Sequence, residues 1–118
     1  MKSDPRDASA PINLGNMLRT HGRKVEAEAA FRAATQTDPL FAEAWYNLGD
    51  LLGDQGRSEA AIECLRKTMR VAPNYADAMF NLALLLQRKN QYADAANYWR
   101  RILPTMVIRN GLRAHAGV

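Results

Sequence analysis

Cysteine and long apolar segments are what this chain of 118 residues most lacks. Its single cysteine, Cys64, excludes an intrachain disulfide and favours a reducing, cytoplasmic location. No apolar run approaches the roughly 18 residues that cross a membrane. The polar start, Met1 to Pro5, has no apolar stretch typical of a signal peptide. We therefore expect no membrane association.

Residues for catalysis and cofactor binding are also scarce. The two histidines, His21 and His115, are not closely spaced with each other or with Cys64, so they do not predict a zinc site. No glycine-rich phosphate loop or nucleophile motif is present. The sequence predicts a protein that is not an enzyme and has no cofactor and no metal.

What the chain does contain is a repeat with a period of 34 residues. It divides without gaps into units 8–41, 42–75 and 76–109. We expect residues 1–7 to be a disordered lead and residues 110–118 an irregular tail. Residues that superpose at this period are Asn13, Asn47 and Asn81; Leu14, Leu48 and Leu82; and Ala27, Ala61 and Ala95.

Each unit predicts two helices joined by a turn. Gly22, Gly56 and Asn90 are placed to end the first helix of each unit, because these residue types adopt the left-handed conformation most easily. Pro39 and Pro73 close the first two units, since proline cannot continue a helix. Ser9 is the expected cap of the first helix, with Pro11 in its first turn.

Apolar residues at helical spacing predict the inner faces of these helices. In the third unit Pro104 interrupts the spacing, and Thr105 is expected to begin a short separate turn. The predicted inner faces include Leu14, Gly15, Met17 and Leu18; Trp45, Leu48, Gly49, Leu51 and Leu52; Met79, Leu82, Leu85 and Leu86; and Tyr98, Trp99, Ile102 and Leu103.

Small residues recur where two helices must approach closely. Gly15, Gly49 and Ala83 share one register of the first helices. Overpacking such a position separates the helices, so we expect Gly49→Leu to lower the melting temperature more than most core truncations do.

These residues and their spacing resemble the tetratricopeptide repeat family. The second unit carries the family's residues most fully, with Trp45, Leu48, Gly49, Ala61 and Pro73. The other units depart at the tryptophan position, where they have Pro11 and Met79. The resemblance implies an all-α fold, a right-handed α-solenoid of three helix–turn–helix repeats.

The resemblance also implies a concave groove lined by the first helices. One row of groove residues, Asn13, Asn47 and Asn81, suits a peptide backbone because a carboxamide both donates and accepts hydrogen bonds. Alternatively, asparagine is the family's default at this position and binds nothing. The expected peptide-binding residues are Ile12, Asn13, Asn16, Glu43, Tyr46, Asn47, Asp50, Asp77, Phe80, Asn81, Leu84 and Arg88.

A second row, Ile12, Tyr46 and Phe80, offers apolar anchors for a partner, or else packs as peripheral core. The groove centre is expected to be acidic and to favour a partner with basic residues. The acidic residues are Glu43, Asp50, Asp54 and Asp77, with Arg19 and Arg88 toward the edges.

Two narrower functions are not expected. Some relatives clamp the C-terminal carboxylate of chaperones; Asn16 and Asn47 fit that set, but Ile12, Asp77 and Asn81 replace its cations. Nucleic-acid binding is not expected either, because the basic second helices lack interleaved exposed aromatics. Those basic residues are Arg66, Lys67, Arg70, Arg100 and Arg101.

The sequence therefore predicts a non-catalytic interaction module, or scaffold, that binds an extended peptide in its groove. One alternative is homo-oligomerisation through an exposed C-terminal helix face carrying Tyr98, Trp99, Ile102 and Leu103. The other is a regulatory domain of a larger enzyme or transcription factor.

Overall fold

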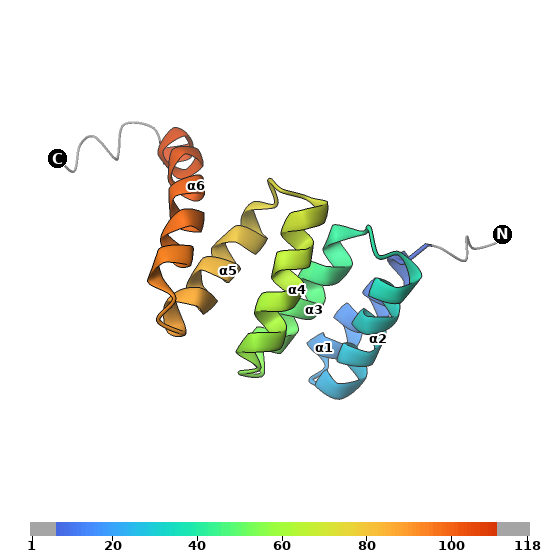
Figure 1. Cartoon of the computed structure of the whole chain (residues 1–118). Helices are drawn as coiled ribbons and strands as arrows, with labels where there is room; N and C mark the ends of the chain where they lie inside the picture. The colour runs from blue at the N-terminus through green and yellow to red at the C-terminus, as the bar shows by residue number, and fades with distance from the viewer. Residues whose placement is uncertain (1–6, 111–118) are drawn as a thin grey trace. The chain divides into compact units, whose positions relative to one another are not determined.

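A computed structural model describes the backbone of residues 7–110 and the side chains of residues 7–103. The expected disordered lead, apart from Asp7, and the expected tail from residue 111 onward lie outside the described residues. Within the described part the chain forms six α-helices and no strand (Figure 1). They are α1 Ser9–Thr20, α2 Lys24–Thr37, α3 Ala42–Asp54, α4 Ser58–Val71, α5 Ala76–Arg88 and α6 Tyr92–Asn110.

The turn inside each helix pair has the same geometry. Gly22 and Gly56 both have φ of 77°, and Asn90 has φ of 63°, so all three adopt the left-handed conformation. After each of them, a backbone N–H returns to the last turn of the preceding helix; Arg23 N–H donates to the Leu18 carbonyl at 2.9 Å. The three predicted helix ends are confirmed.

Two helix boundaries differ from the prediction. Ser9 is the first residue of α1 rather than its cap, and its own N–H donates to Oδ1 of Asp7 at 2.9 Å. A carboxylate two residues earlier thus satisfies a free N–H of the first turn. At the other end, α6 continues through Pro104 to Asn110 without a separate turn at Thr105. Proline removes one N–H from the helix and disfavours the turn before it, but the helical backbone continues past Pro104.

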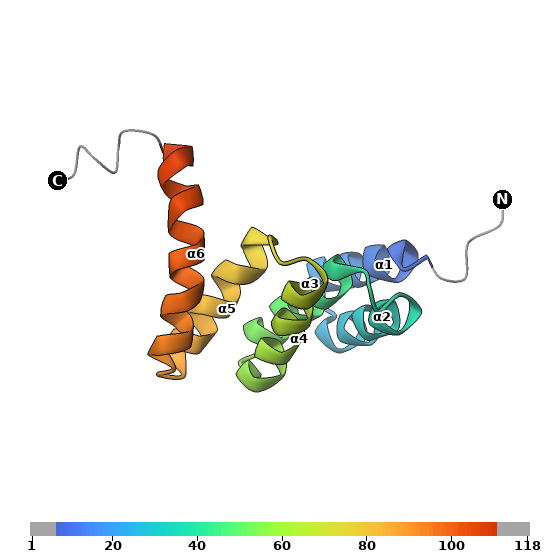
Figure 2. The ribbon, with the colours of Figure 1, turned by 45° about the horizontal axis from the view of Figure 1, so that its top comes forward.

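The chain forms two compact units, residues 1–75 and 76–118, and the boundary coincides with a predicted repeat boundary. In the first unit α1 packs on α2, α3 packs on α4, and α2 packs on α3. Figures 1 and 2 show α1 and α3 on one side of this unit and α2 and α4 on the other. The largest fully buried side chains of this unit are Phe31, Leu48, Leu51, Leu52, Leu65 and Thr68.

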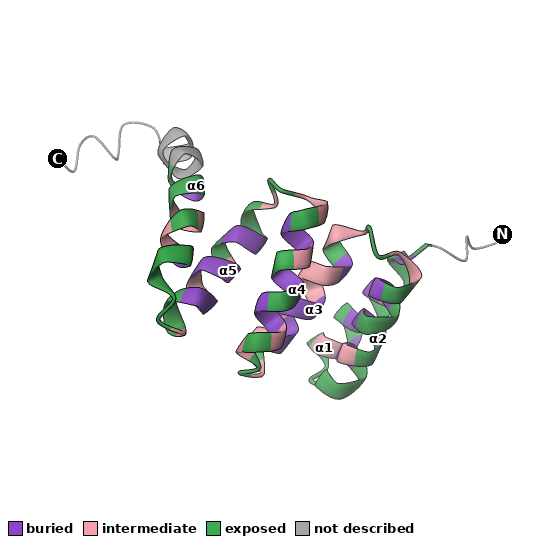
Figure 3. Cartoon of the chain, in the orientation of Figure 1, coloured by how far each residue is buried: buried purple, intermediate pink, exposed green. Residues whose placement is uncertain are grey.

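The buried faces of the helices turn toward their partners (Figure 3), but α1 does so differently from the prediction. Leu14 and Met17 are exposed, although they were expected on its inner face. Ile12 is buried instead, in a cluster with Ala8, Ala34 and Ala44.

Helices α1 and α2 approach each other closely at Gly15. A Cβ atom added at Gly15 would lie 2.6 Å from Cδ1 of the buried Phe31 ring. At Gly49 the nearest atom would be Cγ of Leu65, at 3.0 Å. Real Cβ atoms do not approach a neighbour as closely as at Gly15, so that glycine is required by packing. The expectation of small residues at close helix contacts is met at both positions.

The second unit consists of α5 and α6. Met79, Leu82, Ala83 and Leu86 of α5 are buried, as predicted. Leu103 of α6 was expected on the inner face but is exposed. Trp99 is half-buried; its Nε1 donates to Oε1 of Gln87 at 3.2 Å, and its ring meets Phe80 edge-on at 5.4 Å.

A charged network joins the two repeats of the first unit on the α2 and α4 side. Glu28 of α2 accepts hydrogen bonds from Nε of Arg32 at 3.0 Å and from Nη1 of Arg57 at 2.6 Å. Burial of Glu28 opposes its charge, but these two hydrogen bonds outweigh burial and hold the pKa of its carboxyl below the usual value.

Removing the Glu28 charge is expected to weaken the fold at neutral pH only. A carboxyl whose pKa is lower in the folded state stabilises above its unfolded pKa, and this stabilisation is lost as the pH falls through the folded value. Glu28→Gln should lower the free energy of unfolding by about 1 kcal/mol at pH 7. The difference from wild type should shrink below about pH 4.3.

Urea unfolding at a series of pH values measures this difference. Glu26→Gln is the matched control, because the Arg23–Glu26 pair is exposed and local to one helix end. It should change stability by less than about 0.5 kcal/mol. If Glu28→Gln lowered the free energy of unfolding as much in acid as at pH 7, the negative charge of Glu28 would not be the cause of the loss.

Candidate functional site

The first helices of the first unit are joined by one arginine. Nη1 of Arg19 on α1 lies 2.9 Å from Oδ2 of Asp50 on α3, and its Nη2 pairs with Oδ2 of Asp54. Burial opposes the charge of Arg19, but the hydrogen bonds and charges of the two carboxylates outweigh burial and raise the pKa of the guanidinium. Arg19 therefore stays charged and fixes α1 beside α3.

This ion pair changes the expected charge of the site. The sequence placed Arg19 toward an edge and left Asp50 and Asp54 as acidic groups for a partner. In the structure one guanidinium is shared by both carboxylates, so the trio has a net charge of one negative unit instead of two. We call the surface of α1 and α3 around this trio the first-helix face. It comprises Asn13, Asn16, Arg19, Glu43, Tyr46, Asn47, Asp50 and Asp54.

The asparagines of the first-helix face are available for hydrogen bonding. Asn13 and Asn16 are exposed on α1, and Asn47 is half-buried on α3. Within residues 7–103 none of their side-chain amides makes a hydrogen bond to another residue. Each amide thus offers two donor hydrogens and an acceptor oxygen to a ligand.

The tyrosine of this face is held in place by a second tyrosine. The Tyr46 and Tyr75 rings are stacked, with centroids 5.1 Å apart and planes at 27°. We did not select Tyr75 from the sequence. A signal was available, because Tyr75 follows Phe41 by one period of 34 residues and both are aromatic.

Ile12 does not belong to the face, and its selection as a peptide-binding residue was wrong. It is 3% exposed and packs with Ala8, Ala34 and Ala44. Small residues on α2 and α3 leave room for an aliphatic side chain to reach inward from α1. The alternative interpretation of this position, peripheral core, is the one that holds.

The remaining selected residues lie on α5 in the second unit. Asp77 and Arg88 are exposed, and Asn81 and Leu84 are half-buried. Phe80 is partly exposed and contacts Trp99. Along α5 these residues occupy the positions that the first-helix face occupies on α1 and α3.

Trp45, expected in the helix stack, lies half-buried beside α4. Its Nε1 donates to the Pro39 carbonyl at 2.8 Å, and Nζ of Lys67 lies 4.4 Å from the ring centroid. A cation over an aromatic face is attracted to its electrons. Lys67, one of the basic residues of the second helices, thus has an interaction partner within the chain, the Trp45 ring.

The described residues hold no cluster suited to a metal ion. No group of three or more His, Cys, Asp or Glu side chains among them is arranged to hold a metal. Burial raises the pKa of the Cys64 thiol, the largest of several influences, which disfavours the reactive thiolate. No helix within the described ranges is both long enough and apolar enough to cross a membrane.

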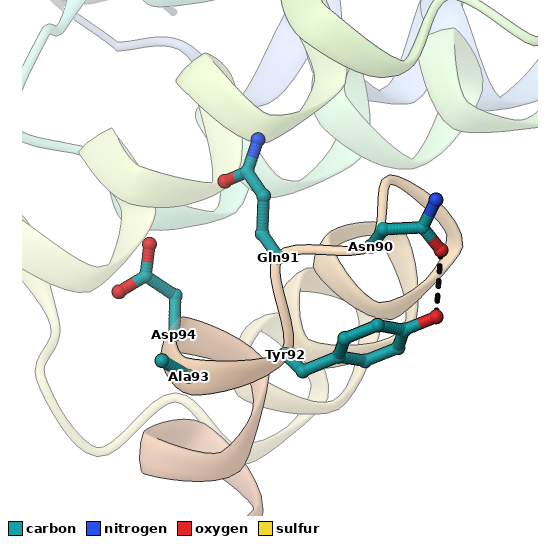
Figure 4. Close-up of a pocket in the computed structure, with 5 residues that line it drawn as sticks. All are labelled: Asn90, Gln91, Tyr92, Ala93 and Asp94. Atoms are coloured by element: carbon teal, nitrogen blue, oxygen red, sulfur yellow. Dashed lines mark hydrogen bonds between the residues drawn. The ribbon is translucent and has the colours of Figure 1, made fainter.

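A shallow depression before α6 is formed by Asn90–Asp94 (Figure 4). The Tyr92 hydroxyl donates to Oδ1 of Asn90 at 2.6 Å across its rim. All its lining residues come from one turn and the helix start that follows. It has no buried charged group with which to select a ligand.

Sequence comparison identifies the family of this chain. A sequence profile of the tetratricopeptide repeat matches residues 40–106. A second profile with the same description matches residues 2–40 and 12–62. The chain therefore belongs to the tetratricopeptide repeat family. The predicted all-α solenoid of helix–turn–helix repeats is confirmed, and families of this kind are generally non-catalytic interaction modules.

Solved structures of similar fold include two of MamA and one of YrrB. The first MamA structure is 25% identical with a TM-score of 0.82, covering 91% of this chain and 63% of MamA. The second is 27% identical with a TM-score of 0.77, covering 86% and 55%. YrrB, a TPR protein with an unusual peptide-binding site, is 24% identical with a TM-score of 0.78, covering 84% and 51%. This chain thus spans roughly half to two thirds of their lengths. A search of curated proteins finds no match.

Proposed function

We propose that this chain binds an extended segment of another protein along the first-helix face. The observation that carries the proposal is Asn47. It is a mid-helix asparagine, half-buried at the centre of the face, and its amide has no hydrogen-bond partner among the described residues. Asparagine is a poor residue in a helix interior, so its place there costs stability. A peptide backbone offers the donor and acceptor that such an amide lacks.

The charges of the face define the partner further. Glu43 is exposed in the first turn of α3, and the Arg19 trio adds one more negative charge. Acidic side chains gathered on one surface attract a basic peptide and repel an acidic one. We therefore propose a partner segment with lysine or arginine, bound in the cytoplasm, where an unpaired cysteine remains reduced.

The fold is compatible with this use. YrrB, a protein of similar fold, has a peptide-binding site. That likeness supports a peptide as the class of ligand, while the residues proposed here come from this chain's own surface.

One substitution distinguishes the effect of the Asn47 amide on peptide binding from its effect on stability. Asn47→Ala should weaken binding of a peptide selected from a library by about five- to tenfold, as expected for the loss of one or two hydrogen bonds. It should also raise the free energy of unfolding by about 0.5 kcal/mol, because alanine is the better helix former. Fluorescence anisotropy and urea unfolding measure the two effects.

Gln36→Ala is the matched control, since it removes an exposed amide from the second-helix side of the same unit. It should leave peptide affinity unchanged. If the Asn47→Ala and Gln36→Ala variants bound every selected peptide with the same affinity, the first-helix face would not be the binding surface.

A further inference from the structure

The ion pair between α1 and α3 is not part of the repeat pattern. Arg19 of α1 pairs with two carboxylates of α3, through Nη1 with Asp50 at 2.9 Å and through Nη2 with Asp54. One period after Arg19 the sequence has Gly53, and one period after Asp50 it has Leu84. A contact needed to pack the repeats in general would recur at these registers. The pairing therefore belongs to this surface and not to the packing that the repeats share.

This ion pair lies one helical turn from the amides of the proposed peptide site. Asn16 is three residues before Arg19 on α1, and Asn47 is three residues before Asp50 on α3. Residues three apart are neighbours on the surface of a helix. A peptide that crosses these amides therefore comes within reach of the ion pair.

The two carboxylates of the ion pair differ in accessibility. The Asp54 side chain is 59% exposed, whereas the side chains of Asp50 and Arg19 are 36% and 23% exposed. A cationic side chain arriving from solvent thus meets Asp54 first. It can replace Nη2 of Arg19 there, while Nη1 keeps its hydrogen bond to Asp50. Such an exchange breaks one exposed ion pair and forms another, so it contributes little net affinity.

We propose, on the basis of the proposed function, that Arg19 sets how strongly the first-helix face selects basic peptides. The arginine is an internal competitor, because it already holds the Asp54 carboxylate that a lysine or arginine of the partner would bind. The partner's basic side chain gains at Asp54 what Arg19 loses. Arg19 thereby limits the selectivity of the face for basic segments.

Removing the guanidinium should therefore strengthen binding of a basic partner. Arg19→Gln should bind a basic peptide selected from a library about two- to fivefold more tightly than wild type does, the range for one exposed ion pair. The gain should shrink as the salt concentration rises, because salt screens exposed charges. It should vanish for an analogue of the peptide with glutamine at its basic positions. Fluorescence anisotropy measures each affinity.

A double-mutant cycle with Asp54→Asn distinguishes competition from a change in overall charge. In the wild-type background Asp54→Asn should change peptide affinity little, because Arg19 already occupies that carboxylate. In the Arg19→Gln background it should remove most of the gain, which gives a coupling between the two positions. Additive effects would mean that Arg19 acts only through the overall charge of the face.

Arg32→Gln is the matched control. Arg32 also pairs with a carboxylate, that of Glu28, but it lies on the α2 and α4 side of the unit (Figure 1). Its removal changes the net charge equally and should leave peptide affinity unchanged. Arg19→Lys keeps the charge and should bind the peptide as wild type does. Circular dichroism melts check the fold of each variant; if Arg19→Gln is unstable, Arg19→Met, which keeps an apolar stem, replaces it.

Two results would overturn this proposal and leave the peptide site standing. One is binding of the basic peptide to Arg19→Gln that is unchanged or weaker, which would mean that Arg19 does not compete with the partner. The other is additivity in the double-mutant cycle. Asn47→Ala separates both from a failure of the proposed function. If it leaves the affinity of the same peptide unchanged, the peptide does not bind the first-helix face, and both proposals fail together.

Discussion

Leu48→Ala is expected to destabilise the first unit by about 2–5 kcal/mol, the range for a fully buried leucine truncated in a packed core. Leu48 is 1% exposed on α3, with helices packed on both of its sides. The truncation removes buried apolar atoms and leaves a cavity that the neighbouring helices fill only partly.

Leu14→Ala provides the matched comparison, because Leu14 occupies the same register one repeat earlier and is half exposed. It should cost about 1 kcal/mol or less, since much of the side chain already contacts water. Urea unfolding by circular dichroism measures both variants. Equal losses would mean that the two leucines contribute alike to the core, against the difference in their exposure.

Gly15→Ala is expected to destabilise by about 1–3 kcal/mol through overpacking, whereas Gly49→Ala should be close to neutral. Both substitutions gain about 1 kcal/mol of helix propensity. The difference lies in the facing side chain. At Gly15 the new methyl would lie 2.6 Å from Cδ1 of the buried Phe31 ring. At Gly49 it would lie 3.0 Å from Cγ of Leu65 and 3.2 Å from Cβ of Cys64, so these neighbours need to move by only a few tenths of an ångström.

A double substitution tests this cause. Phe31 and Leu65 share a register, so Gly15→Ala with Phe31→Leu reproduces in the first repeat the pairing that Gly49→Ala makes in the second. The alanine should then cost less in the Phe31→Leu background than beside the native ring, a coupling that a double-mutant cycle measures. Identical costs in both backgrounds would show that the ring is not what excludes the methyl.

Local signals in the sequence predicted most of the secondary structure, apart from the helix boundaries at Ser9 and Pro104. Gly22, Gly56 and Asn90 end the first helices as predicted, because the left-handed turn depends on the residue that occupies it. The period of 34 residues likewise predicted two helices for each unit, and the described residues contain six helices in that order. Both follow from residue type and spacing alone.

Burial could not be transferred from one repeat to the next in the same way. Leu14 and Leu48 are the same residue at the same register, but Leu14 is 48% exposed and Leu48 is 1% exposed. Ile12 was selected for a groove by register, whereas the small side chains of Ala34 and Ala44 admit it to the core. Exposure depends on which helices lie alongside, and register does not include that information.

Side-chain pairing across the repeats was also beyond the sequence. Arg19 and Asp50 are 31 residues apart, off the period, so no repeat alignment relates them. Their contact depends on how far a long guanidinium side chain reaches from α1 to α3. That contact reduces the negative charge of the first-helix face, which the sequence overestimated.

The most direct test of the binding face is an amide NMR titration of the isotope-labelled protein with a basic peptide selected from a library. We expect the largest chemical-shift changes on α1 and α3, at Asn13, Asn16, Tyr46, Asn47 and Asp50. Changes concentrated on α2 and α4 instead would place the peptide on the opposite side of the unit and contradict the proposal.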